Sequence, residues 1–108
     1  VYRGAFAISI CPADKIESPT IVGAQAADEL LNIVGIKASF VLTEYQGKIY
    51  VSSRSIDEIN VQKIMERLGG GGHLNMAGCQ LRDCTVSQAQ RLIEDTIDEM
   101  LEEGDIEE

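Results

Sequence analysis

Four consecutive glycines, at residues 69–72, directly precede His73, the only histidine of the chain. Glycine loses more backbone freedom on folding than any other residue, so such a run is costly unless the geometry requires it. One such requirement is the close approach of bare backbone to an anion, because neighbouring N–H groups can converge on a phosphate. The imidazole can donate a hydrogen bond, carry charge near neutral pH or bind a metal. The run therefore indicates either a phosphate-binding loop or a flexible loop that ends in a surface histidine.

A second chemical feature is Arg54, which stands among hydroxyl side chains near the end of an expected strand: Ser52, Ser53 and Ser55. A guanidinium group pairs with two phosphate oxygens at once, and serines add neutral donors. Taken alone, the arginine fits an exposed edge residue with a weak ion pair. Combined with the glycine–histidine run, it favours ligand binding. Asn75 follows closely and is interpreted as reading a base edge or capping the loop.

The spacing argues against several nucleotide-binding and catalytic classes. The glycines follow an expected helix and no Gly-Lys-Ser/Thr is present, which differs from a P-loop. No GxGxxG follows a strand, which argues against a dinucleotide fold of the Rossmann type. With one histidine and scattered acids, the chain shows no Ser-His-Asp arrangement and no set of metal ligands for phosphodiester hydrolysis. We therefore predict no catalytic residue and no metal ligand in this chain.

The three cysteines, Cys11, Cys79 and Cys84, are odd in number and form no CxxC pair. They are interpreted as free thiols in a reducing cytoplasm. A metal site built from Cys79, Cys84 and His73 is a minor alternative. Phe40, Tyr45 and Tyr50 are interpreted as packing residues and not as platforms for base stacking.

Hydrophobic periodicity and turn residues predict the elements that position these groups. Strands are expected at residues 5–10, 38–45, 49–54 and 77–81, with a hairpin turn at residues 46–48. A helix is expected to begin at Ser18-Pro19 and to end at Gly35, and a second to run from Val61 to the glycines. A long amphipathic helix follows, capped by Thr85 or Ser87. The order β-α-β-β-α-β-α predicts an α/β (α+β) domain with a mixed sheet of about four to five strands flanked by helices.

Length and charge bound the class of protein further. The 108 residues predict one domain spanning residues 1–108, and the absence of an initiator Met is read as an excised piece of a longer protein. The net charge of -9 lies in residues 94–108, which hold nine acids and no base, while the rest has nine of each. Residues 104–108 are expected to fray. The neutral body has no basic stripe, which argues against long nucleic acid and favours a small phosphorylated ligand.

Three segments together resemble one known family: Val51-Ser52-Ser53-Arg54-Ser55, Asn60-Val61, and residues 68–78, which read Leu-Gly-Gly-Gly-Gly-His-Leu-Asn-Met-Ala-Gly. They are similar to the substrate-binding, DHH-associated lobe of the DHH phosphoesterase superfamily, and the resemblance covers nearly the whole chain. Residues 59–68 are similar in particular to the membrane-anchored bacterial cyclic-di-AMP phosphodiesterases.

The resemblance implies a division of labour between two lobes. A separate Asp-His-His lobe holds two manganese ions, and this lobe binds the substrate and closes the cleft. The fragment, which lacks that motif and any cofactor, is then inactive alone, while the parent, anchored in the bacterial membrane, hydrolyses cyclic-di-AMP to linear pApA in the cytoplasm. By this resemblance Arg54 clamps a phosphate with support from Ser55, the backbone of Gly70, Gly71 and Gly72 approaches the nucleotide, and His73 contacts a phosphate or a base.

Two alternatives stay open at this point. The first is the substrate lobe of an oligoribonuclease or exonuclease of the same superfamily, which would act on short oligonucleotides. The second is a protein-interaction module that docks a partner through the apolar stripe of residues 85–103. The expected partners are thus a cyclic dinucleotide or short oligonucleotide and the catalytic DHH lobe, without membrane contact by this domain. Oligomerisation is left open.

Overall fold

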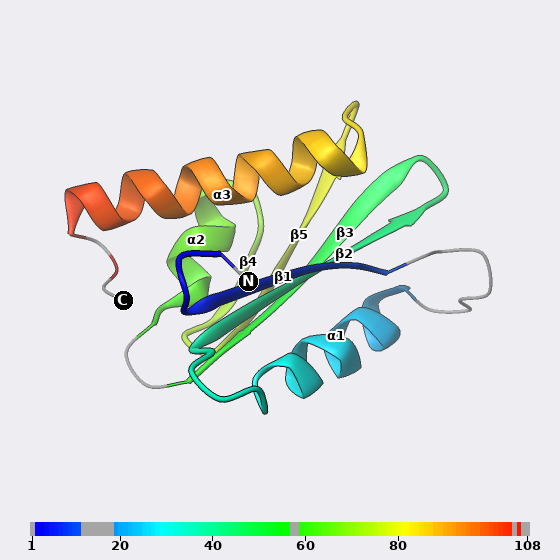
Figure 1. Cartoon of the computed structure of the whole chain (residues 1–108). Coiled ribbons are helices and arrows are strands. Elements are labelled where there is room, and N and C mark those ends of the chain that lie inside the picture. The colour runs from blue at the N-terminus through cyan, green and yellow to red at the C-terminus, as the bar shows by residue number, and fades with distance from the viewer. Residues whose placement is uncertain (1, 12–18, 57–58, 105, 107–108) are drawn as a thin grey trace.

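The computed structural model describes residues 2–11, 19–56, 59–104 and 106 (Figure 1). Its elements follow in the order β1 (Phe6–Cys11), α1 (Pro19–Leu30), β2 (Ala38–Tyr45), β3 (Lys48–Ser55), α2 (Val61–Arg67), β4 (Gly71–His73), β5 (Met76–Arg82) and α3 (Val86–Glu103). The expected mixed α/β domain is confirmed, with five strands in one sheet.

One element was not expected from the sequence. Three residues of the glycine–histidine run, Gly71–His73, form the edge strand β4, where a loop was predicted. Glycines have low strand propensity, so periodicity gives no sign of this strand. It exists because the chain reverses after His73 and β4 pairs antiparallel with β5, with Gly71 opposite Gly78 and His73 opposite Met76. The glycine run is therefore held in the sheet over part of its length.

The sheet has the strand order β1-β2-β3-β5-β4. The first two strands are parallel, and α1 supplies the crossover between them. The other neighbouring pairs are antiparallel, and β2 joins β3 through Gln46 and Gly47, both at positive φ (51° and 77°). This is the backbone of a two-residue hairpin loop, whose twist matches that of the strands. The expected hairpin is thereby confirmed.

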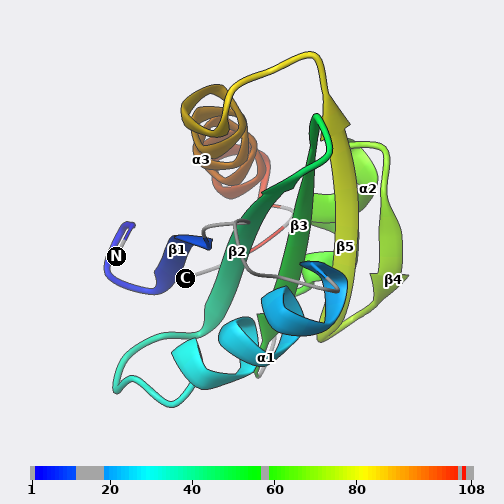
Figure 2. The same ribbon diagram turned by 90° about the vertical axis from the view of Figure 1, so that its right-hand side faces the viewer.

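Helices cover both faces of the sheet, with α2 and α3 on one face and α1 on the other (Figures 1 and 2). The face under α2 and α3 carries the main core, which includes the fully buried Phe6, Phe40, Leu42, Ile64, Met65, Ile93, Ile97 and Met100. The α1 face is more polar, since Ser39, Thr43 and Ser52 are buried there. Close packing by α1 needs Gly23, because a Cβ at this position would lie 2.8 Å from Ser52 Oγ. The pocket described below opens on this polar face.

Helix boundaries follow local capping, with one correction. As predicted, Thr85 caps α3: its hydroxyl accepts from Gln88 N–H, while the Gln88 side chain accepts from Thr85 N–H. The helix α1 begins at Pro19, as predicted, and the expected cap Ser18 lies outside the described residues. The prediction that this helix continues to Gly35 is wrong, because α1 ends at Leu30. Gly35 lies in a later turn with φ of 90°.

The apolar stripe of α3 belongs to the core. Ala89, Ile93, Ile97 and Met100 are all 0% exposed, so the stripe that a partner would have to contact is covered by the sheet and α2. Leu92 of the same stripe is 43% exposed, so most but not all of the surface on which the interaction-module alternative depends is covered. In the expected frayed tail, Gly104 caps α3 in the left-handed conformation and Ile106 is only 4% exposed. None of the described helices combines the length and apolar composition needed to cross a membrane.

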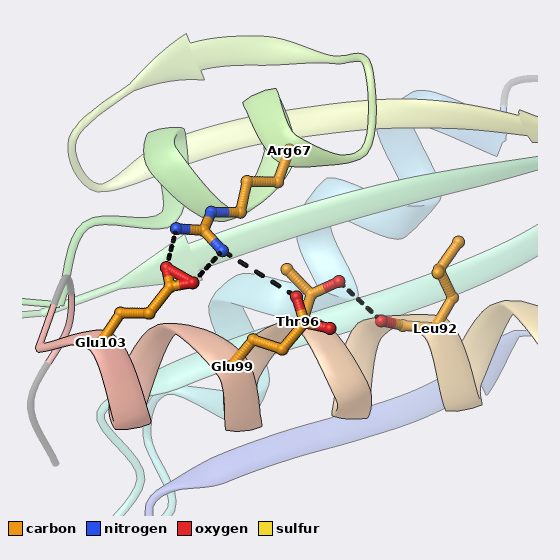
Figure 3. A network of polar contacts seen from close by, with 5 residues as sticks. All are labelled: Arg67, Leu92, Thr96, Glu99 and Glu103. Carbon is orange, nitrogen blue, oxygen red and sulfur yellow. Dashed lines mark hydrogen bonds and ion pairs between the residues drawn. The ribbon is translucent and has the colours of Figure 1, made fainter.

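Arg67, the last residue of α2, connects this helix to α3 (Figure 3). Its guanidinium lies 2.7 Å from a carboxylate oxygen of Glu103 and 3.9 Å from one of Glu99. Within α3, the Thr96 hydroxyl donates to the carbonyl of Leu92. Because the glycine run starts two residues after Arg67, this ion pair holds the end of α2 at the point where that run begins.

We expect a Glu103→Gln variant to be less stable than the wild type near neutral pH and equally stable in acid. The hydrogen bond from Arg67 lowers the pKa of Glu103 from its usual 4.5. The ion pair therefore stabilises the folded protein above pH 4.5. This stabilisation is lost as the pH falls through the lowered pKa of Glu103 in the folded state. Thermal unfolding from about pH 7 to about pH 3 measures this. Glu102→Gln is the matched control, and a Tm difference that persisted in acid would contradict the ion-pair explanation.

Candidate functional site

A pocket of about 550 Å³ opens on the α1 face of the sheet, beside α1 and over β3 and β5. This volume falls within the range of about 300–1,000 Å³ that ligand sites usually have. The described residues that line it are Ala24, Tyr50, Val51, Ser52, Arg54, Gly69, Gly70, Gly78, Cys79, Gln80 and Arg82. They include two arginines and no carboxylate, so the pocket suits an anionic ligand.

The register of the strands explains why the floor of this pocket is bare. Ser52 of β3 lies opposite Gly78 of β5, which in turn lies opposite Gly71 of β4. Residues opposite one another point to the same face of a sheet, so this row carries no side chain on its two outer strands. A ligand can therefore approach the backbone itself at this row.

Two glycines of the run are required by close packing. A Cβ at Gly70 would lie 2.1 Å from the carbonyl oxygen of Gly78 and 2.5 Å from Cys79 Cβ. A Cβ at Gly72 would lie 2.5 Å from Ala77 Cα, and Gly72 also has a φ of 147°. Gly71 differs, because a Cβ there would meet nothing within 4 Å. The glycine run therefore packs closely against β5 at residues 70 and 72, and there is free space beside residue 71.

Arg54 is held in place on the wall of this pocket. Its side chain is 12% exposed, and its Nε lies 3.0 Å from Asp28 Oδ1 of α1, an ion pair without the alignment of a hydrogen bond. One terminal nitrogen donates to the carbonyl oxygen of Ser53 at 2.8 Å. These two contacts use part of the five-donor guanidinium and leave other donors for a ligand. Asp28, at 62% exposure, reaches the arginine from the solvent side.

Ser55 and Asn75, both predicted to be site residues, contact each other and not the pocket. The Ser55 hydroxyl is buried and donates to the carbonyl of Ile59 at 2.6 Å, while Asn75 Nδ2 donates to Ser55 Oγ at 3.0 Å. The backbone N–H of Ser55 also donates to the carbonyl of Asn75. These bonds tie the end of β3 to the turn between β4 and β5. Their geometry gives both residues a role in holding the β4–β5 turn beside Arg54.

His73 lies on the same sheet face as Arg54. The register aligns Arg54, Met76 and His73 in one row across three strands. At about 4.8 Å per strand spacing, the backbones of Arg54 and His73 are roughly 10 Å apart. The imidazole is exposed and lies beyond the residues that line the pocket. A ligand in the pocket would have to extend over Met76 to reach it.

The described residues gather no cluster of three or more His, Cys, Asp or Glu side chains that would suit a metal ion. Burial raises the pKa of Cys79 to about 12, so this thiol stays protonated at neutral pH. It is therefore a poor metal ligand and a poor nucleophile. The described site therefore has groups that suit the binding of a ligand. They are bare backbone, hydroxyl groups, the fixed guanidinium of Arg54 and the exposed guanidinium of Arg82.

Four residues that line the pocket were missed by the sequence analysis: Ser52, Tyr50, Gln80 and Arg82. Ser52 was noted only as a neighbour of Arg54, and Tyr50 was interpreted as packing. Alternation along β3 does place residues 50, 52 and 54 on one face. The contribution of β5 could not be found this way, because alternation within one strand does not give its register against β3.

Comparison with known proteins identifies relatives of this chain. Residues 5–103 match the DHHA1 domain family. The cyclic-di-AMP phosphodiesterase PdeA of Listeria monocytogenes is 44% identical over 99 residues, and cyclic-di-AMP phosphodiesterases named GdpP from Geobacillus thermodenitrificans and Bacillus subtilis are 43% and 40% identical. These matches cover 91%, 90% and 96% of this chain but only 15%, 15% and 16% of those proteins. The chain thus spans a small part of the relatives it matches.

Solved structures share the fold at low identity. An exopolyphosphatase-related protein from Bacteroides fragilis superposes with a TM-score of 0.77 at 22% identity, over 88% of this chain and 29% of that one. The C-Ala domain of alanyl-tRNA synthetase from Aquifex aeolicus gives a TM-score of 0.66 at 16% identity, over 84% of this chain and 88% of that one. At these identities the comparison supports the architecture alone.

Proposed function

Because this chain belongs to the DHHA1 domain family, we propose that it is the nucleotide-binding lobe of a manganese-dependent phosphodiesterase that hydrolyses cyclic-di-AMP to linear pApA. The observation that carries the proposal is Arg54, fixed on the wall of a pocket whose floor is bare glycine backbone. Fixed guanidinium donors suit a phosphate, and a bare floor lets a nucleotide lie against the sheet.

Electrostatics supports this assignment. Although the chain carries a net charge of -9, the residues lining the pocket include Arg54 and Arg82 and no acid. The helix α3, which holds many of the acids, packs on the opposite face of the sheet (Figures 1 and 2). On the pocket side Asp28 pairs with Arg54, and the exposed Arg82 adds a second cation for a doubly charged dinucleotide.

The hydrolytic step belongs, in this proposal, to a second lobe of the parent protein. The described residues do not fit manganese, since they gather no cluster of ligands for it. The role proposed for this lobe is to hold a phosphate and a nucleoside in a fixed orientation, which lowers the entropic part of the barrier. A cytoplasmic location and a membrane anchor elsewhere in the parent are part of the same proposal.

We expect the isolated chain to bind cyclic-di-AMP and pApA without metal. An amide NMR titration with each ligand in turn measures this. Shifts should centre on the backbone of Gly70 and Gly78 and on residues around Arg54, because these line the pocket, and should extend to Gly71, which pairs with Gly78. We expect the dissociation constant to lie near the millimolar range, which corresponds to a binding free energy of about 4 kcal/mol. The isolated lobe provides only part of the contacts, while the ligand loses its full translational freedom on binding.

The same titration separates the alternatives. Tighter binding of short linear oligonucleotides than of either dinucleotide would favour the oligoribonuclease or exonuclease lobe. An absence of shifts with every nucleotide, both for the chain alone and for a protein that also carries its catalytic lobe, would contradict the proposed binding role.

A further inference from the structure

The pocket extends beyond the glycine floor to an end formed by Tyr50 of β3 and by Gln80 and Arg82 of β5. We propose that this end is a second subsite, which takes the second nucleotide of a dinucleotide and in which Gln80 selects adenine. The inference rests on the proposed function, because it assumes that Arg54 holds the first phosphate. It adds a binding site for the second nucleotide and a residue that selects the base of that nucleotide.

The spacing along the strands fits two nucleotides. Arg54 lies opposite Met76, and Gln80 and Arg82 are four and six residues further along β5. At about 3.4 Å per residue these positions lie roughly 14 and 20 Å from the row of Arg54. The side chains of Arg54 and Arg82 can extend toward each other, so their guanidinium groups can lie closer together than these backbone distances. A single mononucleotide bound at Arg54 would leave the far end of the pocket empty.

The side chains at this end are free to bind. Among the described residues, no hydrogen bond or ion pair occupies the side chains of Gln80 and Arg82, and both are exposed. Lys48 lies opposite Arg82 in the register, so a second cation stands at this end of the sheet. Arg82 and Lys48 therefore suit a second phosphate, in the way that Arg54 suits the first.

The chemistry of Gln80 favours adenine over guanine. A glutamine amide offers one donor and one acceptor side by side, which match N7 and the 6-amino group of adenine. Guanine presents two acceptors, N7 and O6, on the same edge and would leave the glutamine acceptor unpaired. Tyr50, directly opposite Gln80 in the register, places an aromatic ring beside that base. Stacking on such a ring is tolerant of sequence, so Gln80 is the residue that distinguishes the bases.

The test compares the affinities for cyclic-di-AMP and cyclic-di-GMP by titration of a protein that carries this domain together with its catalytic lobe and is kept free of metal. We expect the wild type to prefer the adenine ligand by roughly 5- to 100-fold, as for one bidentate base contact. Gln80→Ala should remove most of this preference, and Gln80→Arg should reverse it, because arginine matches N7 and O6 of guanine. Gln62→Ala, on α2 and outside the pocket, is the matched control and should keep the wild-type ratio.

A second experiment tests the subsite through its proposed phosphate contact and not through the base. Arg82→Ala should weaken binding of cyclic-di-AMP about 10-fold while leaving AMP unchanged, because AMP occupies only the Arg54 end. The control is Arg91→Ala on α3. An unchanged adenine preference in both Gln80 variants, in a chain that still binds cyclic-di-AMP, would overturn the subsite and leave the proposed function standing. Failure of the wild-type chain to bind any dinucleotide, both alone and in the protein that also carries its catalytic lobe, would overturn both.

Discussion

In a protein that carries this domain together with its catalytic lobe, an Arg54→Ala variant is expected to bind cyclic-di-AMP about 100-fold more weakly than the wild type. Its guanidinium is held by Asp28 and by the carbonyl of Ser53, so its remaining donors face the ligand with little further ordering. Hydrogen bonds to charged groups contribute about 1.5–3 kcal/mol each, and 100-fold corresponds to about 2.7 kcal/mol. In a protein that also carries the catalytic lobe, turnover of cyclic-di-AMP should fall by a similar factor.

Arg54→Lys separates charge from geometry. Lysine keeps the positive charge but has no planar fork, so we expect it to recover only a small part of the lost affinity. Removal of the arginine should cost the domain little stability, because Asp28 is 62% exposed and becomes hydrated when its partner is gone. Affinity is measured by titration and stability by thermal unfolding. Wild-type affinity in Arg54→Ala would exclude this arginine from phosphate binding.

A Gly70→Ala variant is expected to unfold at a Tm roughly 10–20 °C below that of the wild type, for a loss of about 2–3 kcal/mol. The added Cβ would lie 2.1 Å from the carbonyl oxygen of Gly78 and 2.8 Å from Cys79 Cα. These are backbone atoms of a paired strand, which cannot turn aside as a flexible side chain can. The glycine run must therefore separate from β5, and binding should fall together with stability.

Gly71→Ala is the matched control, and it should have the opposite pattern. A Cβ at residue 71 meets nothing within 4 Å, so stability should stay within about 0.5 kcal/mol of the wild type. The new methyl group would, however, stand on the side-chain-free row shared with Gly78. We expect binding of cyclic-di-AMP to weaken about 10-fold as the floor is filled. Equal stabilities of the two variants would contradict the packing described for the run.

The sequence by itself determined most of the elements and the family, but not β4 or the end of α1. The two strands within residues 38–54, the turn between them and the apolar stripe of α3 are local signals that the structure confirms, and of the two expected caps it selects Thr85. The structure places Arg54, Gly69 and Gly70 in the lining of one pocket. The binding roles of all seven candidate residues remain predictions: Arg54, Ser55, Gly70, Gly71, Gly72, His73 and Asn75.

The tertiary structure decided what local signals do not contain. The neighbouring strand decides whether a glycine is required by close packing or leaves space for a ligand. Gly70 and Gly72 pack closely against β5, whereas a Cβ at Gly71 would meet nothing within 4 Å. The register between β3 and β5 places Tyr50 beside Gln80, although 29 residues separate them in the chain. That register is a pairing between segments far apart in the sequence. For this reason the glycines could be recognised in the sequence, while the shape of the pocket and its far end could not.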